Sequence, residues 1–174
     1  MARDGADPGA GSMTSFSPLT ALGVLAEHGV RSVMIGGVAA AAHGSPSLTG
    51  DLDLCYARDP ENLDRLAAAL AELHASLRGA DPDTGFVLDA RTIAAGDHFT
   101  FTTDAGDLDV LGTPAGTDGF ADLDANAIDV DLDGFIVRTA SLEDLIRMKR
   151  AAGRPKDRME LEILGALRDE LRGG

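Results

Sequence analysis

The segment Thr49-Gly50-Asp51-Leu52-Asp53-Leu54 has the residue types and spacing of a chemical site. In a β-strand, side chains at i and i+2 share a face, so Thr49, Asp51 and Asp53 are expected to point one way. Two ionised carboxylates roughly 6–7 Å apart repel each other, and strand propensity disfavours Asp. A divalent cation would remove the repulsion and use the carboxylate oxygens as ligands. The segment therefore predicts a metal site, with a solvated acidic strand face as the alternative.

The segment Asp107-Leu108-Asp109-Val110-Leu111 repeats this alternation further along the chain. A third carboxylate from it would complete an oxygen-rich metal site. Phosphoryl transfer needs such a site, because one metal activates the attacking oxygen and another stabilises the leaving pyrophosphate.

Gly36 and Gly37 follow the apolar run Val33 to Ile35 and precede an Ala-rich segment. Glycines at a strand-to-helix junction let backbone N–H groups approach a phosphate at the start of the helix. An ordinary turn is the alternative. Their position, some fourteen residues before Asp51, favours one site shared with the aspartates.

Together these segments resemble the core signature of the polymerase-beta-like nucleotidyltransferase superfamily. Within it, the sequence is most similar to small bacterial nucleotidyltransferases related to abortive-infection (AbiE-type) toxins and to minimal nucleotidyltransferases. The resemblance runs from about residue 20 to 168. The matching segments are Val33–Ala39, His43-Gly44, Leu48–Leu54, Ala140–Arg150 and Gly153–Asp157.

The resemblance implies a Mg²⁺-dependent enzyme that moves a nucleoside monophosphate from an NTP, such as ATP, to an acceptor hydroxyl. It implies two Mg²⁺ ions held by Asp51, Asp53 and Asp109. The catalytic residues would be these three aspartates together with Lys149. The acceptor would be a tRNA, a protein or a small molecule.

The resemblance also implies a nucleotide-binding set. The two glycines would hold the triphosphate, the lysines would lie near the phosphates or the acceptor, and Asp157 would be a further active-site acid. The complete set is Gly36, Gly37, Thr49, Lys149, Lys156 and Asp157.

One position departs from the family: Ser47 stands where many relatives carry Arg. The change removes one phosphate contact. It favours an alternative, a non-catalytic protein of the same fold that acts through a toxin or antitoxin partner. The aspartates and glycines favour the enzyme, since an inactive descendant gains nothing from self-repelling carboxylates. An acidic domain that binds Ca²⁺ or Mg²⁺ without transfer chemistry is a third reading.

Charge is distributed unevenly along the 174 residues, whose formal net charge is −14. Residues 81–133 hold one basic and 13 acidic side chains, whereas residues 147–158 hold six basic and one acidic. The acidic total disfavours an unaided tRNA substrate, because RNA and DNA contacts depend on Lys and Arg. The basic segment suits a triphosphate. The single cysteine, Cys55, excludes a disulfide framework and a Cys-based zinc site.

No run of the sequence approaches 18 apolar residues, so no membrane span is expected. Residues 1–14 are predicted to be a disordered leader that lacks the features of a signal peptide, and a cytoplasmic location is expected. Residues 15–140 are predicted to form the nucleotidyltransferase core. Residues 141–174 are predicted to form a helical extension packed on that core.

The elements that must position these residues follow from periodicity and capping signals. Asp59 and Ser141 are predicted helix caps, and Asp133-Gly134 is a predicted hairpin turn. The fold class expected is α+β, with a mixed central sheet flanked by helices and a helical C-terminal segment. Helices are predicted over 18–28, 38–43, 60–77, 141–153 and 156–171, and strands over 31–35, 48–56, 85–89, 98–103, 107–111, 128–133 and 135–139.

Overall fold

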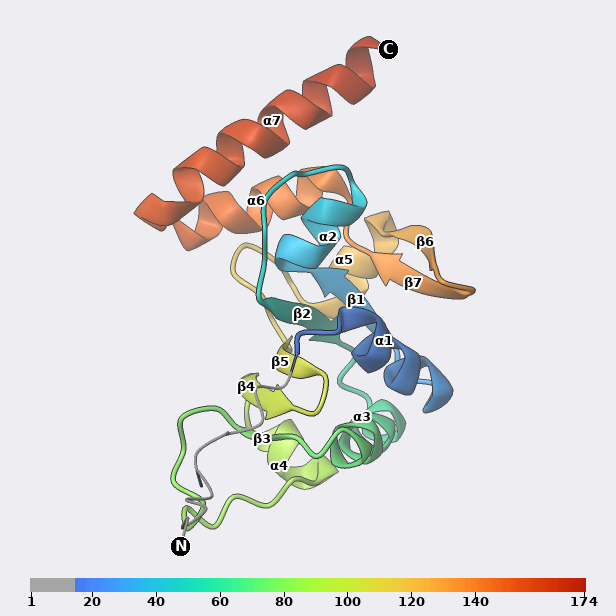
Figure 1. Ribbon diagram of the computed structural model, residues 1–174, viewed down its shortest axis with the longest axis vertical. Helices are drawn as coiled ribbons and strands as arrows, with labels where there is room; N and C mark the ends of the chain where they lie inside the picture. Colours follow the sequence, from blue (N-terminus) through green and yellow to red (C-terminus); the bar gives the residue numbers. More distant parts are fainter. Residues whose placement is uncertain (1–14) are drawn as a thin grey trace, which may run out of the picture.

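A seven-stranded mixed sheet organises the computed structural model, which describes residues 15–174. The strand order is β3-β4-β5-β2-β1-β7-β6, with helices packed on both faces (Figure 1). This architecture confirms the predicted α+β class with a mixed sheet. The predicted leader, 1–14, lies outside the described residues.

The strands are β1 (Ser32–Ile35), β2 (Asp51–Tyr56), β3 (Ser76–Leu77), β4 (His98–Thr103), β5 (Gly106–Leu111), β6 (Ile128–Leu132) and β7 (Phe135–Thr139). The helices are α1 (Pro18–Glu27), α2 (Gly36–Ala42), α3 (Pro60–Glu72), α4 (Ala90–Ala95), α5 (Phe120–Asn126), α6 (Leu142–Ala152) and α7 (Arg158–Gly173), with a short 3₁₀ turn, η1 (Pro155–Asp157), before α7.

The central strands β2 and β5 lie side by side and run parallel. Their register sets Asp51 opposite Asp107 and Asp53 opposite Asp109. The alternate side chains on both strands are buried in the core, namely Leu52, Leu54, Leu108 and Val110. Because successive side chains of a strand point to opposite faces, burial of these residues directs the four aspartates to the other face.

Local signals explain where several helices begin and end. The Asp59 side chain accepts a hydrogen bond from the Asn62 backbone N–H, and Ser141 does the same for Asp144. Gly153 adopts a left-handed conformation at the end of α6. These caps satisfy backbone groups that the helix itself leaves unpaired.

The predicted helix over 60–77 is too long. In the structure α3 ends at Glu72, His74 adopts a positive φ of 51°, and Ser76–Leu77 pairs with β4 as a short strand. Leu77 continues the helical spacing of leucines but packs against the core from this strand. Tertiary packing thus overrides the periodic pattern.

The predicted strand over 85–89 is also wrong. Residues 85–88 have no regular structure, and Phe86 instead packs against Phe99 and Phe101 with ring centroids 6.4 and 6.3 Å apart. Aromatic burial therefore explains the apolar character of this segment without strand pairing. Two short helices, α4 and α5, were not predicted. Helix α4 begins directly after Asp89, whose side chain accepts a hydrogen bond from the Thr92 backbone N–H.

The last two helices lie on the same side of the sheet as α2 (Figure 1). Helix α6 contacts α2 and buries four apolar residues, while α7 packs on α6 and buries only Leu164 completely. The buried residues of α6 are Leu142, Leu145, Ile146 and Met148. Within residues 15–174, no helix combines the length and apolar character needed to cross a bilayer.

Candidate active site

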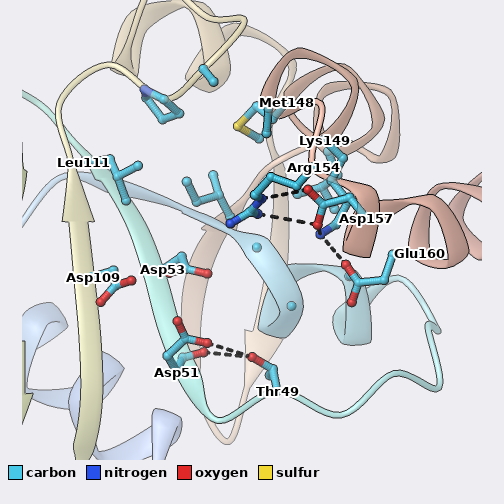
Figure 2. A pocket seen from close by; sticks show the side chains of 18 of the residues that line it. Thr49, Asp51, Asp53, Asp109, Leu111, Met148, Lys149, Arg154, Asp157 and Glu160 are labelled. Carbon is cyan, nitrogen blue, oxygen red and sulfur yellow. Dashed lines mark hydrogen bonds and ion pairs between the residues drawn. The ribbon is translucent and has the colours of Figure 1, made fainter. Parts of the chain in front are cut away.

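Three carboxylates meet on the open face of the central strands. Asp51 and Asp53 come from β2 and Asp109 from β5, and oxygen atoms of all three lie within 4.8 Å of one another (Figure 2). All three side chains are half-buried. Hard oxygen ligands at this spacing suit Mg²⁺ or Mn²⁺.

Asp107 shares the face of Asp109 but does not join this cluster, which we call the carboxylate triad (Asp51, Asp53 and Asp109). The Asp107 side chain is 41% exposed, against 14% for Asp109. Its carboxylate faces the guanidinium of Arg78 instead, 3.4 Å away. The structure thus distinguishes two aspartates that the alternating sequence makes equivalent.

Electrostatic repulsion within the triad is strong. Burial, followed by the negative charges of Asp51 and Asp109 and a hydrogen bond to Asp109, raises the pKa of Asp53 from 3.8 to about 7. The positive charge of Lys149 opposes this rise. A divalent cation bound by the three carboxylates would relieve the repulsion, so the donor set and its charge fit a metal.

The two glycines are needed because α2 begins very close to β2. Gly36 has a φ of +69°, and a Cβ atom there would lie 2.9 Å from Cγ of Asp53 and closer still to its Oδ2. A Cβ atom on Gly37 would lie 2.6 Å from the Cβ of Thr49. This close packing explains why both positions require glycine. Contact of the two glycines with a triphosphate stays a prediction.

Thr49 restrains the first carboxylate of the triad. It lies just before β2 rather than within it, and its hydroxyl donates to Oδ1 of Asp51 at 3.1 Å, with the Asp51 carbonyl at 3.2 Å (Figure 2). Ser47 lies in the same loop and lines the cavity described below.

Lys149 on α6 is held by two acids, Asp157 at the end of η1 and Glu160 in the first turn of α7. Its ammonium pairs with Asp157 at 3.4 Å and also with Glu160 (Figure 2). Arg154 donates to Asp157 at 2.8 Å. Burial alone would raise the pKa of Asp157, but the Arg154 hydrogen bond and the Lys149 charge outweigh it and hold this pKa below its ordinary value. Asp157 is therefore an ionised counter-ion for Lys149 and Arg154.

One cavity of about 700 Å³ unites the predicted site. All the residues proposed from the sequence line it, although they come from widely separated segments of the chain. They are Gly36, Gly37, Thr49, Asp51, Asp53, Asp109, Lys149, Lys156 and Asp157. This volume is within the range of small-molecule sites and is larger than a metal ion alone requires.

Two residues of the site were missed from the sequence. Arg78 follows β3 and donates to Oδ1 of Asp109 at 2.8 Å and to the Phe101 carbonyl at 2.9 Å. Because the predicted helix was extended through Leu77, the short strand that places Arg78 beside Asp109 was not predicted. Glu160 pairs with Lys149, and no local pattern of the sequence indicates that contact.

Comparison with solved structures identifies the architecture. The Thermotoga maritima protein TM1012, a candidate nucleotidyltransferase, superposes with a TM-score of 0.52 at 17% identity, covering 92% of this chain and 98% of its own. The lincosamide antibiotic adenylyltransferase LnuA, bound to lincomycin, gives a TM-score of 0.58 at 11% identity, covering 86% of this chain and 94% of its own. This chain has the nucleotidyltransferase fold.

A third structure with this nucleotidyltransferase fold is the antibiotic-resistance factor ANT(2'')-Ia, with a TM-score of 0.51, 19% identity and 89% coverage of both chains. No protein-family model matches the sequence, and comparison with curated protein sequences finds no match. The likeness therefore rests on the three-dimensional arrangement. The narrower resemblance to AbiE-type toxins stays a prediction.

Proposed function

We propose that the protein is a divalent-metal-dependent nucleotidyltransferase that moves a nucleoside monophosphate from an NTP to an acceptor hydroxyl and releases pyrophosphate. The carboxylate triad carries this proposal. Strand register brings Asp109 of β5 beside Asp51 and Asp53 of β2, at an electrostatic cost that a bound divalent cation would remove. The fold of the solved neighbours supports the same chemistry.

The triad would hold Mg²⁺, and we propose two ions when the nucleotide is bound. Such ions supply charge stabilisation for the attacking and leaving oxygens of an in-line displacement. Thr49 keeps Asp51 turned toward the cavity through its hydroxyl. Arg78 donates to one oxygen of Asp109 and thereby orients this carboxylate within the triad.

The triphosphate would lie between the start of α2 and the basic residues at the end of α6. Gly36 and Gly37 leave the backbone accessible there, and Lys149 and Lys156 line the same cavity. Lys149 is close enough to the triad to lower the pKa of Asp53. A phosphate held by Lys149 would therefore lie near the metal ligands, as nucleotidyl transfer requires.

A small molecule is the acceptor that the charge distribution favours. The chain carries a formal net charge of −14, which opposes binding along an RNA backbone. Two neighbours, LnuA and ANT(2'')-Ia, are by name an antibiotic adenylyltransferase and an antibiotic-resistance factor. We therefore propose transfer to a hydroxyl of a small molecule. Membership of a toxin–antitoxin pair, with its partner protein, stays a prediction, as does the cytoplasmic location.

A non-catalytic binding protein is the second candidate. One observation favours it, because Glu160 and Asp157 already neutralise Lys149. The resemblance of the sequence adds that Ser47 stands where an arginine is expected. The intact triad opposes it, because a binding protein has no need of three crowded carboxylates.

A transfer assay separates the two candidates. Purified protein is incubated with Mg²⁺, each α-³²P-labelled NTP and a panel of hydroxyl-bearing small molecules, total tRNA and cell lysate. The enzyme transfers label to an acceptor, and the transfer disappears in Asp53→Asn and after addition of EDTA. Asp107→Asn is the matched control, since it removes a carboxylate from the same face of the neighbouring strand β5, outside the triad, and should keep the activity. If the folded wild-type protein transfers label to none of these acceptors, the proposal that it is an enzyme is refuted.

A further inference from the structure

The outer edge of strand β6 has no partner strand among the described residues. β6 is the last strand in the sheet order and pairs with β7 alone. Figure 1 shows the β6–β7 hairpin at the margin of the molecule. In an antiparallel pair, residues alternate between those that bond to the neighbouring strand and those that direct their N–H and C=O groups away from it. The edge of β6 therefore presents backbone groups to which a further strand can bond.

The side chains of β6 form an apolar row and an acidic row on opposite faces. The apolar row is Ile128, Val130 and Leu132, and the acidic row is Asp129 and Asp131. The apolar row is incompletely covered, since Ile128 is 43% exposed and the other two residues are half-buried. Both aspartates are exposed. An added strand would cover the rest of the apolar row and place its other side chains beside the acidic row.

The acidic row keeps a negative charge. Within residues 15–174, Asp131 makes no ion pair, and Asp129 shares the single cation Arg138 with Asp124. Opposite charges directly across two strands stabilise a sheet, and like charges destabilise it. The row therefore favours a neighbour whose side chains are positively charged.

A second copy of β6 does not provide such a neighbour. Acidic and apolar residues alternate, so every register that keeps the apolar side chains on one face sets aspartate opposite aspartate. Edge strands are commonly protected against all partners by lysine, proline or a bulge. β6 has no lysine or proline, and its five residues pair with β7 without a bulge. The charge thus opposes pairing between copies of this chain and leaves the edge accessible to a strand of opposite charge.

We infer that the edge of β6 is a docking site for an extended, basic segment of another protein, in which Lys or Arg alternates with apolar residues. The segment adds a strand to the sheet, with its backbone bonded to the outer groups of β6. Its basic side chains lie beside Asp129 and Asp131, and its apolar side chains cover Ile128. This inference goes beyond the proposed function and does not depend on it.

Fluorescence anisotropy with two labelled peptides tests the docking site. The first peptide, Lys-Val-Lys-Val-Lys-Val, has the proposed pattern. The second, Lys-Val-Lys-Pro-Lys-Val, carries the same charge, but proline at its centre opposes strand pairing. The full-length protein should bind the first peptide at least about tenfold more tightly than the second. Added salt should weaken this binding, because the charges involved are exposed. Amide hydrogen exchange should slow in β6 when the first peptide binds.

Two double variants locate the binding on the acidic row. Asp129→Asn/Asp131→Asn removes both charges of the row and keeps the size and the hydrogen-bonding ability of the side chains. It should weaken binding of the first peptide at least about fivefold. Asp81→Asn/Asp83→Asn is the matched control, since it removes two exposed acids from a loop outside β6 and changes the net charge equally. Its affinity should change less than about twofold.

Three results would overturn the inference. Equal binding of the two peptides means that charge alone attracts them. An equal loss of affinity in the two double variants, or slowed exchange that spares β6, means that the peptide binds elsewhere on the acidic chain. A folded wild-type protein that does not bind the first peptide means that the acidic row only protects the edge. Thermal melting of each variant confirms that it is folded, and none of these results bears on nucleotidyl transfer.

Discussion

The substitution Asp53→Asn should make the protein more stable and inactive at the same time. Ionised Asp53 is half-buried beside two other carboxylates and close to the start of α2. Asparagine keeps the size of the side chain and the ability to hydrogen bond, and it removes one negative charge from the triad. The metal-free fold should gain stability, whereas metal binding should be lost.

The pH dependence fixes the sign of this effect. The folded-state pKa of Asp53 is about 7, against an ordinary value of 3.8. Between these values the folded protein binds more protons than the unfolded chain, so the free energy of unfolding falls as pH rises through this window. The shift corresponds to an upper bound of roughly 4 kcal/mol. Because the cavity opens to water, we expect on the order of 2 kcal/mol at pH 8.

Thermal denaturation followed by circular dichroism measures this gain. In EDTA at pH 8, Asp53→Asn should melt about 4–8 °C above the wild type, and the difference should shrink at pH 4. Added Mg²⁺ should raise the melting temperature of the wild type and not that of Asp53→Asn, because a ligand stabilises only the state that binds it. Asp107→Asn, outside the triad, should behave like the wild type in both conditions.

Two results would refute the reasoning. An Asp53→Asn protein that melts below the wild type at pH 8 in EDTA would mean that the carboxylate is favourable where it lies. A variant that Mg²⁺ stabilises as much as the wild type would mean that Asp53 is not a metal ligand.

Three further substitutions test other contacts of the site. Arg78→Met should lower kcat at least tenfold and leave KM for the NTP within about twofold, because the guanidinium holds Asp109 and does not line the cavity. Glu160→Gln should tighten NTP binding several-fold, measured by calorimetry, since it frees the charge of Lys149. Gly36→Ala should destabilise the fold by at least about 2 kcal/mol in urea denaturation, because its positive φ and the lack of space both exclude a Cβ atom.

Each of these substitutions has a control or a contradicting result. Arg78→Lys should recover part of the lost kcat, and a rise in KM alone would contradict the role given to Arg78. Glu162→Gln, which neutralises an acid of α7 with no ion pair in the described structure, should leave NTP affinity unchanged. A Gly36→Ala protein as stable as the wild type would contradict the close packing described for α2.

The sequence was sufficient to predict two of the three carboxylates of the triad. Asp51 and Asp53 alternate with leucines that the core buries, so their common face follows from strand geometry. The alternation alone does not distinguish Asp107 from Asp109, and Asp109 was named as the third ligand only through the family resemblance. Only the register of two strands separated by about fifty residues distinguishes them, and register between distant strands is a tertiary property.

The surroundings of Arg78 and Lys149 could not be predicted for a related reason. Leu77 continues the leucine spacing of α3, so local periodicity favoured a helix where the chain turns at His74 and pairs with β4. Lys149 was expected to lie near the phosphates or the acceptor, and its pairing with Glu160, which follows the turn at η1, was not predicted. Both contacts depend on how the chain reverses direction, which single-residue propensities specify weakly.

Nucleotidyl transfer moves the α-phosphorus of an NTP to the acceptor. The most direct test runs the transfer assay in parallel with α-³²P-labelled and γ-³²P-labelled NTP, using the acceptor that accumulates label. The proposed mechanism predicts α-label in the product and γ-label in released pyrophosphate, both dependent on Mg²⁺ and on Asp53. Label from the γ position in the product, or in free orthophosphate alone, would contradict nucleotidyl transfer.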